Sequence, residues 1–513
     1  MMRSNKDLFR KNIEKTKLFI KPFLFLFFIY LIALFALFRS DVDFIDDINR
    51  LESKNGGSFF EFGIGYGRFL ASAIGFLLYG GDRMYDISPF SQIIAICFIV
   101  LASIILVYIF CDRKIKYIPL FCTLPLGLSP FFIECFSYKI DAPLMALTVL
   151  LTVIPWIFIE NRKKFISLSI ICLLSVCLIY HVALGLFVII AFFIFSENIK
   201  KTNNIIESSK KCFLIPAICF IITICLFLVI KTIFPTEQGI SMSFNNIFPN
   251  MLNSLRYVIE NSPKNWLILE AIIFILFIAV NILSLPKKYK VFTIALSMFL
   301  PIVLIMISPG VSLIMMPPEK LYLRYMFPTG AVFAIIMILV THYNSEIFFV
   351  NFKINRYFNI PILYFSFSFI VFATAYGNAL GATNDVINER NQYIHAKIVN
   401  IFKNYHTKDN DEIHFYMTEG EPYVGRANAT INAATKYTPI YHLVNTPSVD
   451  NKLLIASFIE KNSTDNPNTI PLVVDPSVSP DRLNKVDEDA YYVYYVKNNE
   501  LYIEIKSVHE TYN

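Results

Sequence analysis

The sequence predicts an α-helical polytopic membrane protein with about eleven transmembrane helices and a small C-terminal α/β domain. Of its 513 residues, 56% are hydrophobic and only 16% are charged, which leaves too few charges to cover soluble domains of this total size. The apolar residues gather in runs of mostly 17 to 22 positions with few or no charges. A helix of about 20 such residues crosses a hydrocarbon core about 30 Å thick. A wholly soluble protein is therefore excluded.

Eleven spans account for the apolar pattern. The first follows a basic stretch, but it is too long for the apolar core of a signal peptide and lacks a small-residue cleavage pattern, so we expect a retained anchor. Residues 165–195 form one run that is too long for one span and too short for two full ones, and a tight hairpin at Tyr180-His181 fits it. The predicted spans are residues 18–38, 89–111, 117–134, 142–160, 165–179, 182–196, 212–233, 265–284, 291–308, 326–342 and 359–380.

The loops between these spans alternate in positive charge. One set holds 21 Lys and Arg residues, whereas the opposite set holds 10 over a greater length. Because cytoplasmic loops carry the excess of Lys and Arg, the N-terminus is predicted to be cytoplasmic, and an odd number of spans places the C-terminus outside. The basic set is residues 1–17, 112–116, 161–164, 197–211, 285–290 and 343–357; the opposite set is residues 39–88, 135–141, 180–181, 234–264 and 309–325.

Charge and hydrophobicity both change near Gly381. Residues 381–513 contain 12 basic and 18 acidic residues, whereas residues 1–380 contain 33 and 21. We therefore predict a transmembrane domain over residues 1–380, which includes the outward loop 39–88, and an outward α/β domain over residues 381–513. In the second domain a helix is expected over residues 384–405, strands over 413–417, 440–444, 453–459 and 470–474, and a hairpin from 490–496 and 501–505.

The outward loop 39–88 opens with four carboxylates, Asp41, Asp43, Asp46 and Asp47. The adjacent Asp46 and Asp47 repel each other, which can raise the pKa of one of them and suits a general base at the membrane surface. The alternative is a solvated helix start with Asp at its cap and first turn. Four nearby carboxylates permit a divalent cation, but their spacing does not specify one.

Basic residues occur in the same loop. Arg68 ends the segment Gly63-Ile64-Gly65-Tyr66-Gly67-Arg68, and together with Arg50 it could hold a lipid-linked phosphate through bidentate hydrogen bonds. For Arg68 alone, a side chain that extends to lipid headgroups is the commoner case. The glycines are no nucleotide-binding motif, because no strand and helix flank them. Residues 59–62 and 69–79 are apolar but too short to span, and we expect them on the membrane surface.

Two further polar groups lie at the outward ends of predicted spans. Glu134, Tyr138 and Asp141 flank the short loop between the third and fourth spans, where polar side chains could complete a site. Their neighbours Ser137 and Lys139 more often cap such a loop. Arg324 precedes the tenth span and is a candidate ligand for a phosphate or a sugar. Structural roles are the commoner expectation for His181, at the tip of the hairpin, and for Glu270 and Lys231, near span ends.

These motifs together resemble the serotype-converting O-antigen glucosyltransferases (Gtr type) of enteric bacteria and their phages, which are polytopic enzymes of the GT-C class. The resemblance covers the first 190 residues best, and it depends on the order and spacing of short motifs. They are Asp46-Asp47-Ile48-Asn49-Arg50, Gly67-Arg68, Asp86-Ile87-Ser88-Pro89-Phe90-Ser91-Gln92 and Glu134-Cys135-Phe136-Ser137-Tyr138-Lys139-Ile140-Asp141.

The resemblance implies an enzyme of the bacterial inner membrane whose active site faces the periplasm. The donor would be undecaprenyl phosphate glucose and the acceptor a hydroxyl of lipid-linked O-antigen, with a donor synthase and a flippase in the same pathway. No other cofactor and no nucleic acid is implied. Asp46 or Asp47 would act as the base, and Arg68 and Arg324 would stabilise the leaving phosphate, although Arg324 is chosen from position and charge alone. Arg50, Glu134, Tyr138 and Asp141 complete the expected substrate-binding residues.

Two alternatives stay open. An O-antigen polymerase, or another transferase of lipid-linked glycans, would share the donor class and the sidedness. Such polymerases usually have Arg-rich outward loops in mid-chain, whereas residues 234–264 contain only Arg256 and Lys264. A flippase or transporter would need ionisable groups within its spans and internal symmetry, and the predicted spans are almost free of charge.

Overall fold

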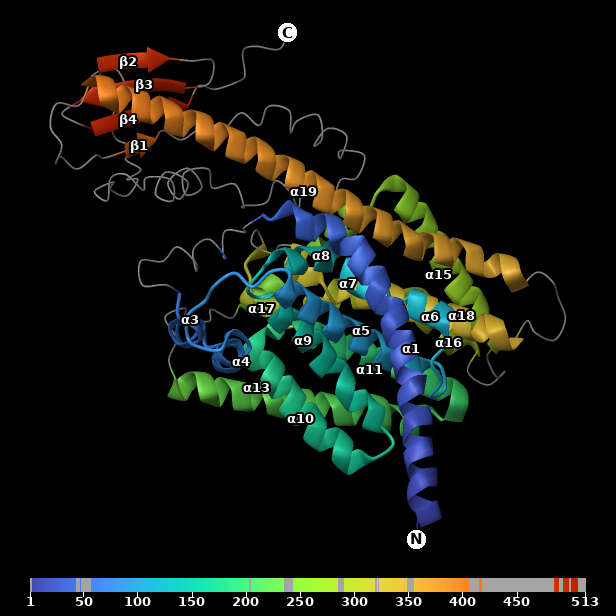
Figure 1. Cartoon of the computed structure of the whole chain (residues 1–513). Coiled ribbons are helices and arrows are strands. Elements are labelled where there is room, and N and C mark those ends of the chain that lie inside the picture. The colour runs from blue at the N-terminus through green and yellow to red at the C-terminus, as the bar shows by residue number, and fades with distance from the viewer. Residues whose placement is uncertain are drawn as a thin grey trace.

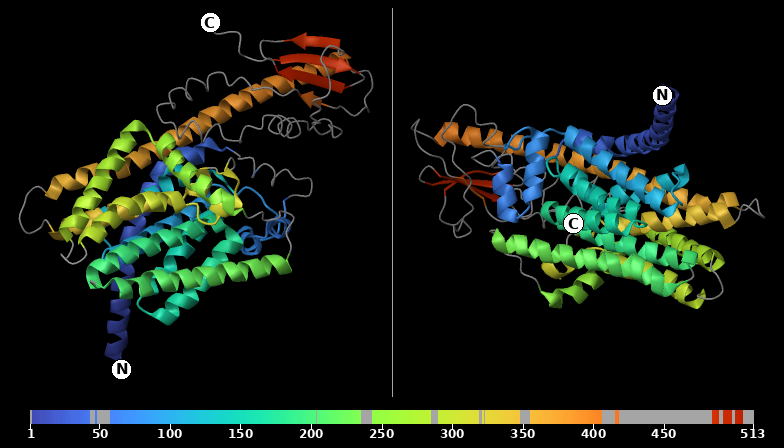
Figure 2. Two further views of the ribbon diagram at one scale, coloured as in Figure 1. Left: turned by 180° about the vertical axis from the view of Figure 1, so that it is seen from behind. Right: turned by 90° about the horizontal axis from the view of Figure 1, so that it is seen from below.

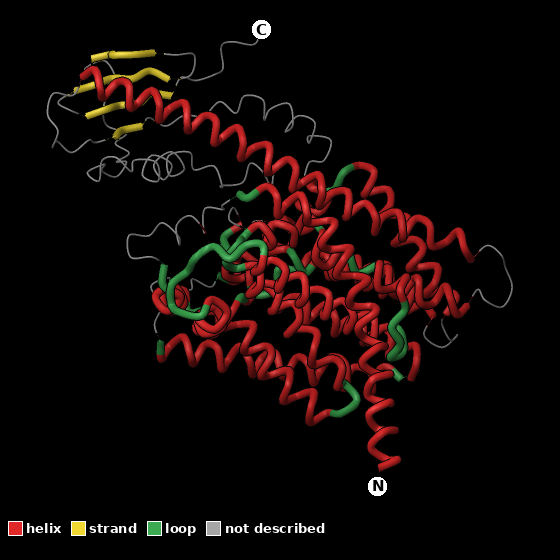
Figure 3. Tube along the Cα trace, in the orientation of Figure 1, coloured by secondary structure: helices red, strands yellow, loops and turns green. Residues whose placement is uncertain are grey.

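The computed structural model is a bundle of helices with a small β-sheet beyond one end (Figure 1). It describes residues 2–42, 47, 57–202, 204–234, 243–284, 290–318, 321, 323–347, 355–405, 415–417, 484–488, 492–497 and 500–505. Figure 3 shows that helices make up almost all of the described chain and that the strands gather in one place. The helical fold class predicted from hydropathy is thereby confirmed.

Within the described residues, seven helical segments are long and apolar enough to cross a membrane. They lie in α1 (Met2–Ser40), α5 (Phe90–Phe110), α11 (Leu184–Thr202), α13 (Ile215–Ile233), α15 (Lys264–Ser284), α18 (Thr329–Ile347) and α19 (Asn355–Tyr405). Aromatic side chains fill the space between some of them. Trp266 of α15, for example, is buried, with its ring 4.5 Å from that of Phe369 and 5.7 Å from that of Phe365, both in α19.

Helices also occupy the other four predicted spans. Compared with the seven segments above, these helices are bent, shorter or more charged. Residues 117–137 form α6 (Tyr117–Phe121), α7 (Pro125–Leu128) and α8 (Pro130–Ser137), with a bend of 65° before Pro130, because proline lacks the N–H that a continuous helix needs. The others are α9 (Ala142–Val153), which continues as the 3-10 helix η1 (Ile154–Phe158), α10 (Arg162–Ile179) and α16 (Lys290–Ile307). The count of eleven spans therefore stays a prediction.

A helix break lies at Tyr180-His181, where a tight hairpin was predicted. Helix α10 ends at Ile179, Tyr180 has extended backbone angles (φ −155°, ψ 97°), and the 3-10 helix η2 (His181–Ala183) leads into α11. The first turn of α11 packs closely against another chain segment, since a Cβ on Gly185 would lie 1.9 Å from the carbonyl oxygen of Ser308. This close approach fixes the position of the break within the bundle.

The two short apolar segments of loop 39–88 form a helical hairpin, α3 (Phe59–Tyr66) and α4 (Phe69–Tyr79). The Phe59 ring packs against Tyr79, with centroids 4.9 Å apart, and occupies the space that a side chain at Gly75 would need. Asp82 closes the base of the hairpin by accepting hydrogen bonds from the Ser58 hydroxyl (2.7 Å) and the Phe60 N–H (3.1 Å).

Helix α19 continues without a break through Gly381, where the domain boundary was predicted. Along its first half it packs against α1 so closely that a Cβ on Gly377 would lie 2.3 Å from the backbone nitrogen of Leu37. Its second half extends beyond the bundle toward the sheet (Figure 2). The helix predicted over residues 384–405 is thus the end of a longer one, and the division into two domains stays a prediction.

The sheet has the strand order β1-β4-β3-β2, built from β1 (Phe415–Met417), β2 (Asn484–Glu488), β3 (Tyr492–Lys497) and β4 (Glu500–Ile505). Strands β3 and β4 form the predicted antiparallel hairpin, whereas β1 pairs with β4 in parallel. Strand β2 was not predicted. The strands expected at 440–444, 453–459 and 470–474 lie outside the described residues. An ion pair of 2.8 Å between Lys397 and Asp487 joins the sheet to α19.

Loops that were predicted to share one side of the membrane do meet. Asp112 pairs with Lys201 at 2.6 Å and with His342 at 3.1 Å, and His342 also accepts a hydrogen bond from Lys116 at 3.1 Å. These four residues come from three segments assigned to the cytoplasmic side or its edge. Which face is cytoplasmic stays a prediction.

Candidate functional site

The loop between α8 and α9 is held by Asp47. The Asp47 carboxylate is completely buried and accepts hydrogen bonds from the backbone N–H of Lys139 (3.0 Å) and of Ile140 (3.1 Å). Hydrogen bonds from N–H groups favour the ionised form of a carboxylate. One of the two aspartates chosen from the sequence therefore positions the 138–141 loop. Its neighbour Asp46 and the nearby Arg50 lie outside the described residues.

Lys139 ties this loop to two other segments. Its ammonium group lies 2.7 Å from Asp41, at the end of α1, and 3.0 Å from Asp86, before α5, while its side chain is only 5% exposed. Burial raises the pKa of Asp86, but hydrogen bonds from Ser88 and the charge of Lys139 outweigh that effect and hold the pKa below its usual value. The loop-binding role expected for Lys139 agrees with these contacts.

Glu134, Tyr138 and Arg324 come together in the structure. The Tyr138 hydroxyl donates a hydrogen bond of 3.0 Å to Glu134, and Arg324 donates one to the Tyr138 hydroxyl. The Arg324 guanidinium also lies 5.4 Å from the centre of the Tyr138 ring, within the range of a cation–π interaction. Glu134 and Tyr138 are 5% and 3% exposed. The bend before α8 allows this contact, because it turns Glu134 and Tyr138 toward the turn η7 (Leu323–Met326) that carries Arg324.

Arg68 approaches the same region from the α3–α4 hairpin. Its guanidinium lies 5.4 Å from the centre of the Tyr180 ring and 5.6 Å from that of Tyr66. Lys231 donates a hydrogen bond of 3.2 Å to the carbonyl oxygen of Tyr66 and thereby adds a further cation. Of the two arginines chosen from the sequence, Arg68 therefore lies against Tyr180, whereas Arg324 lies against Tyr138.

The sequence analysis gave Tyr180 and His181 no role in the functional site. The Tyr180 hydroxyl and the His181 Nε2 atom are buried and have no hydrogen-bond partner among the described residues. The only signal in the sequence was their place at a predicted helix break, where a structural histidine is the commoner expectation. Only the tertiary structure, which places the Arg68 guanidinium against the Tyr180 ring, identifies the two side chains as candidates.

The remaining candidates have separate positions. Asp141 is buried at the start of α9, but its side chain does not cap that helix. Glu270 accepts a hydrogen bond of 3.2 Å from Ser262 and is likewise buried. Ser137 shares a hydrogen bond of 2.8 Å with Tyr376. No group of three or more His, Cys, Asp or Glu side chains suited to a metal ion occurs within the described part of the chain.

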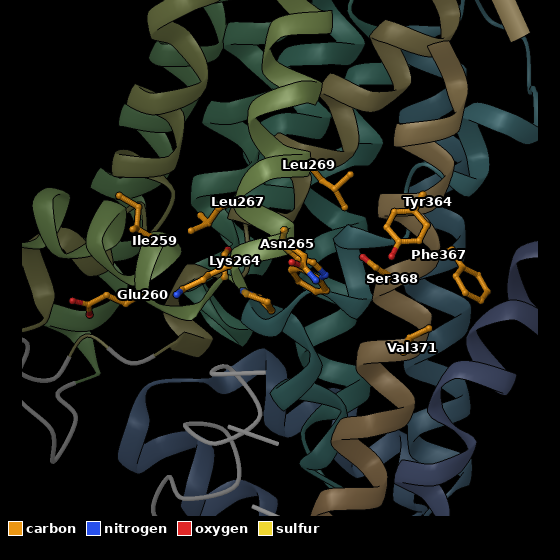
Figure 4. A pocket seen from close by; sticks show the side chains of 13 residues that line it. Ile259, Glu260, Lys264, Asn265, Leu267, Leu269, Tyr364, Phe367, Ser368 and Val371 are labelled. Atoms are coloured by element: carbon orange, nitrogen blue, oxygen red, sulfur yellow. The ribbon is translucent and has the colours of Figure 1, made fainter. Parts of the chain in front are cut away.

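A cavity of about 740 Å³ lies between α14 (Ile247–Asn261), the start of α15 and α19 (Figure 4). Its lining is mixed, with the polar side chains of Lys264 and Asn265 on one side and Tyr364 and Ser368 of α19 on the other. None of its lining residues belongs to the cluster around Tyr138 and Tyr180. The cavity is therefore separate from the candidate site.

Comparisons with known proteins agree with the sequence motifs. The model of the glucosyl transferase GtrII family matches residues 34–341, more than half of the chain, and that range contains every candidate site residue. The uncharacterized 55.3 kDa protein in the gtrB 5′ region of Salmonella phage P22 is 31% identical over 198 residues, which are 38% of this chain and 38% of that protein. No solved structure matches the chain. With its seven apolar helical segments and this family match, the chain is a multi-pass membrane protein and belongs to the glucosyl transferase GtrII family.

Proposed function

We propose that this protein transfers glucose from undecaprenyl phosphate to lipid-linked O-antigen at the periplasmic face of the bacterial inner membrane. The observation that carries the proposal is the placement of two arginines against aromatic side chains within an apolar helical bundle, Arg68 against Tyr180 and Arg324 against Tyr138. A polyprenyl chain needs apolar surroundings, and its phosphate needs cations where the chain leaves the membrane. Membership of a glucosyl transferase family supports the choice of sugar.

The reaction requires a base and a stabilised leaving group. An acceptor hydroxyl oxygen attacks C1 of the donor sugar, the bond between C1 and the phosphate oxygen breaks, and its electron pair leaves with the phosphate. Because both Asp47 carboxylate oxygens accept N–H groups of the 138–141 loop, we assign the removal of the hydroxyl proton to Asp46 and a positioning role to Asp47.

The leaving phosphate gains charge as this bond breaks, and fixed cations stabilise it most at that stage. We assign this role to Arg324 and Arg68, with Arg50 as a further ligand. Tyr138 and Glu134 hold Arg324 through the hydrogen bonds described above. Asp141 lies in the same loop and is assigned to substrate binding. The outward C-terminal region is proposed to bind the acceptor glycan.

The test in cells is mass and linkage analysis of the O-antigen with and without this gene, in a strain that supplies the donor synthase and the flippase. We expect one added hexose branch on each repeat unit. Unchanged repeat units with an altered chain length would instead indicate a polymerase. No change in either property would overturn the proposal and favour a transporter.

A further inference from the structure

The helix break at Tyr180 places two polar side chains inside the bundle. Tyr180 is 4% exposed, and the backbone there is extended between α10 and η2. Its ring stacks on Phe327, with centroids 6.2 Å apart and planes inclined by 15°. The ring of His181 lies 6.2 Å from that of Tyr180. Both side chains therefore lie within one small region at the end of α10.

The Tyr180 hydroxyl and His181 Nε2 are buried and have no hydrogen-bond partner in the part of the chain that the structure describes. A buried polar atom without a partner loses its hydration and gains nothing in return. Such atoms are rare in native proteins, and each one requires an explanation, such as a ligand or a bound water. The chemistry around the two atoms decides which ligand fits.

Cations lie near the two side chains. The Arg68 guanidinium lies 5.4 Å from the centre of the Tyr180 ring, and Arg324 lies three positions before Phe327, on which that ring stacks. Lys231 donates a hydrogen bond of 3.2 Å to the carbonyl oxygen of Tyr66, whose ring lies 5.6 Å from the Arg68 guanidinium. A ligand that accepts hydrogen bonds and carries negative charge would satisfy the buried donors and the cations together. A phosphate oxygen has both properties, whereas a sugar hydroxyl has no charge.

We propose that Tyr180 and His181 bind the phosphate of the lipid-linked donor directly. This inference rests on the proposed function and adds two residues to it. The Tyr180 hydroxyl donates one hydrogen bond, and neutral His181, in the tautomer with its proton on Nε2, donates a second. Neither residue loses a proton during transfer. As the bond between C1 and oxygen breaks, the electron pair moves to the phosphate, and both hydrogen bonds strengthen with its growing charge.

The test uses the full-length protein in lipid nanodiscs, with undecaprenyl phosphate and uncharged undecaprenol as probes. The measured quantity is the ratio of their dissociation constants, because the two probes differ only in the phosphate. We expect the wild type to prefer the phosphate, and Tyr180→Phe and His181→Asn each to reduce this preference about tenfold. Each should also lower kcat about 100-fold, as when one donor to a developing oxyanion is removed.

Two control variants separate binding from structure. His181→Gln returns an amide N–H near the position of Nε2 and should recover most of the preference. Tyr30→Phe removes another buried hydroxyl, which faces the carbonyl oxygen of Leu124 at 3.5 Å, and should leave the ratio and kcat unchanged. Because the ratio is measured on folded protein, a variant that only loses stability lowers the yield and not the ratio.

The outcomes distinguish this inference from the proposed function. If the wild type binds the two lipids equally, the proposed donor class is wrong. If the wild type prefers the phosphate but Tyr180→Phe and His181→Asn keep that preference and kcat, only the assignment of these two residues is wrong. If the Tyr180→Phe and His181→Asn variants are less stable but keep the wild-type ratio of dissociation constants, the assignment is also wrong, and the two side chains bind a structural water instead.

Discussion

Replacing Asp47 by Asn should loosen the 138–141 loop, whereas replacing Asp46 by Asn should stop transfer. The Asp47 carboxylate accepts two backbone N–H groups, at 3.0 Å and 3.1 Å, and is completely buried. In the Asp47→Asn variant one side-chain oxygen remains, the negative charge is lost, and an NH₂ donor faces a backbone donor. Asp46 precedes this anchor in the sequence and is proposed to meet the acceptor hydroxyl.

The magnitude follows from these contacts. A hydrogen bond to a charged group contributes about 1.5–3 kcal/mol, and a buried N–H without a partner costs about 1–3 kcal/mol. We therefore expect Asp47→Asn to destabilise the protein by about 2.5–6 kcal/mol. This loss should appear as a lower Tm. Loss of a general base lowers kcat by about 10²–10⁴-fold.

The assay measures Tm and the initial rate of sugar transfer for both variants in nanodiscs. Asp46→Asn should lose transfer. Asp47→Asn should lower both Tm and kcat, because Lys139 and its neighbours shift. Full transfer activity in Asp46→Asn would refute the proposed base. An unchanged Tm in Asp47→Asn would refute the structural role that its hydrogen bonds indicate.

Three further predictions concern the neighbouring contacts. Tyr138→Phe removes the hydroxyl between Glu134 and Arg324 and should lower kcat about tenfold; initial rates at saturating donor measure this, and an unchanged rate would contradict the positioning role. Arg324→Lys keeps the charge but loses the planar fork, so the KM for the lipid donor should rise about tenfold while insertion is normal; an unaltered KM would argue against phosphate binding. The pKa of Asp86 is lowered in the folded protein. The stability that its ion pair with Lys139 contributes should therefore be fully present above about pH 4, the ordinary pKa of an aspartate, and should be lost as the pH falls further. Comparison of Tm for wild type and Asp86→Asn between about pH 7 and about pH 3 measures that contribution, and a difference that already disappears near pH 6 would refute it.

Some of the site could be predicted from the sequence because the signals are local. Four carboxylates after the first span, an arginine in the same loop and a polar loop after the third span each indicate a possible role by themselves. Their partners could not be inferred. Tyr138 and Arg324 are 186 positions apart, and no periodicity relates them. The bend before α8 had a signal in Pro125 and Pro130, although one span over residues 117–134 was predicted there.

The sequence by itself determined the helical membrane architecture, the break at Tyr180-His181 and the β3–β4 hairpin, because hydropathy and turn chemistry act over short stretches of chain. The tertiary structure alone decided that Asp47 is a buried anchor, that Arg68 lies against Tyr180 and that Arg324 lies against Tyr138. Those relations depend on how helices distant in sequence pack together, and a bilayer imposes apolar surfaces without specifying which surfaces meet.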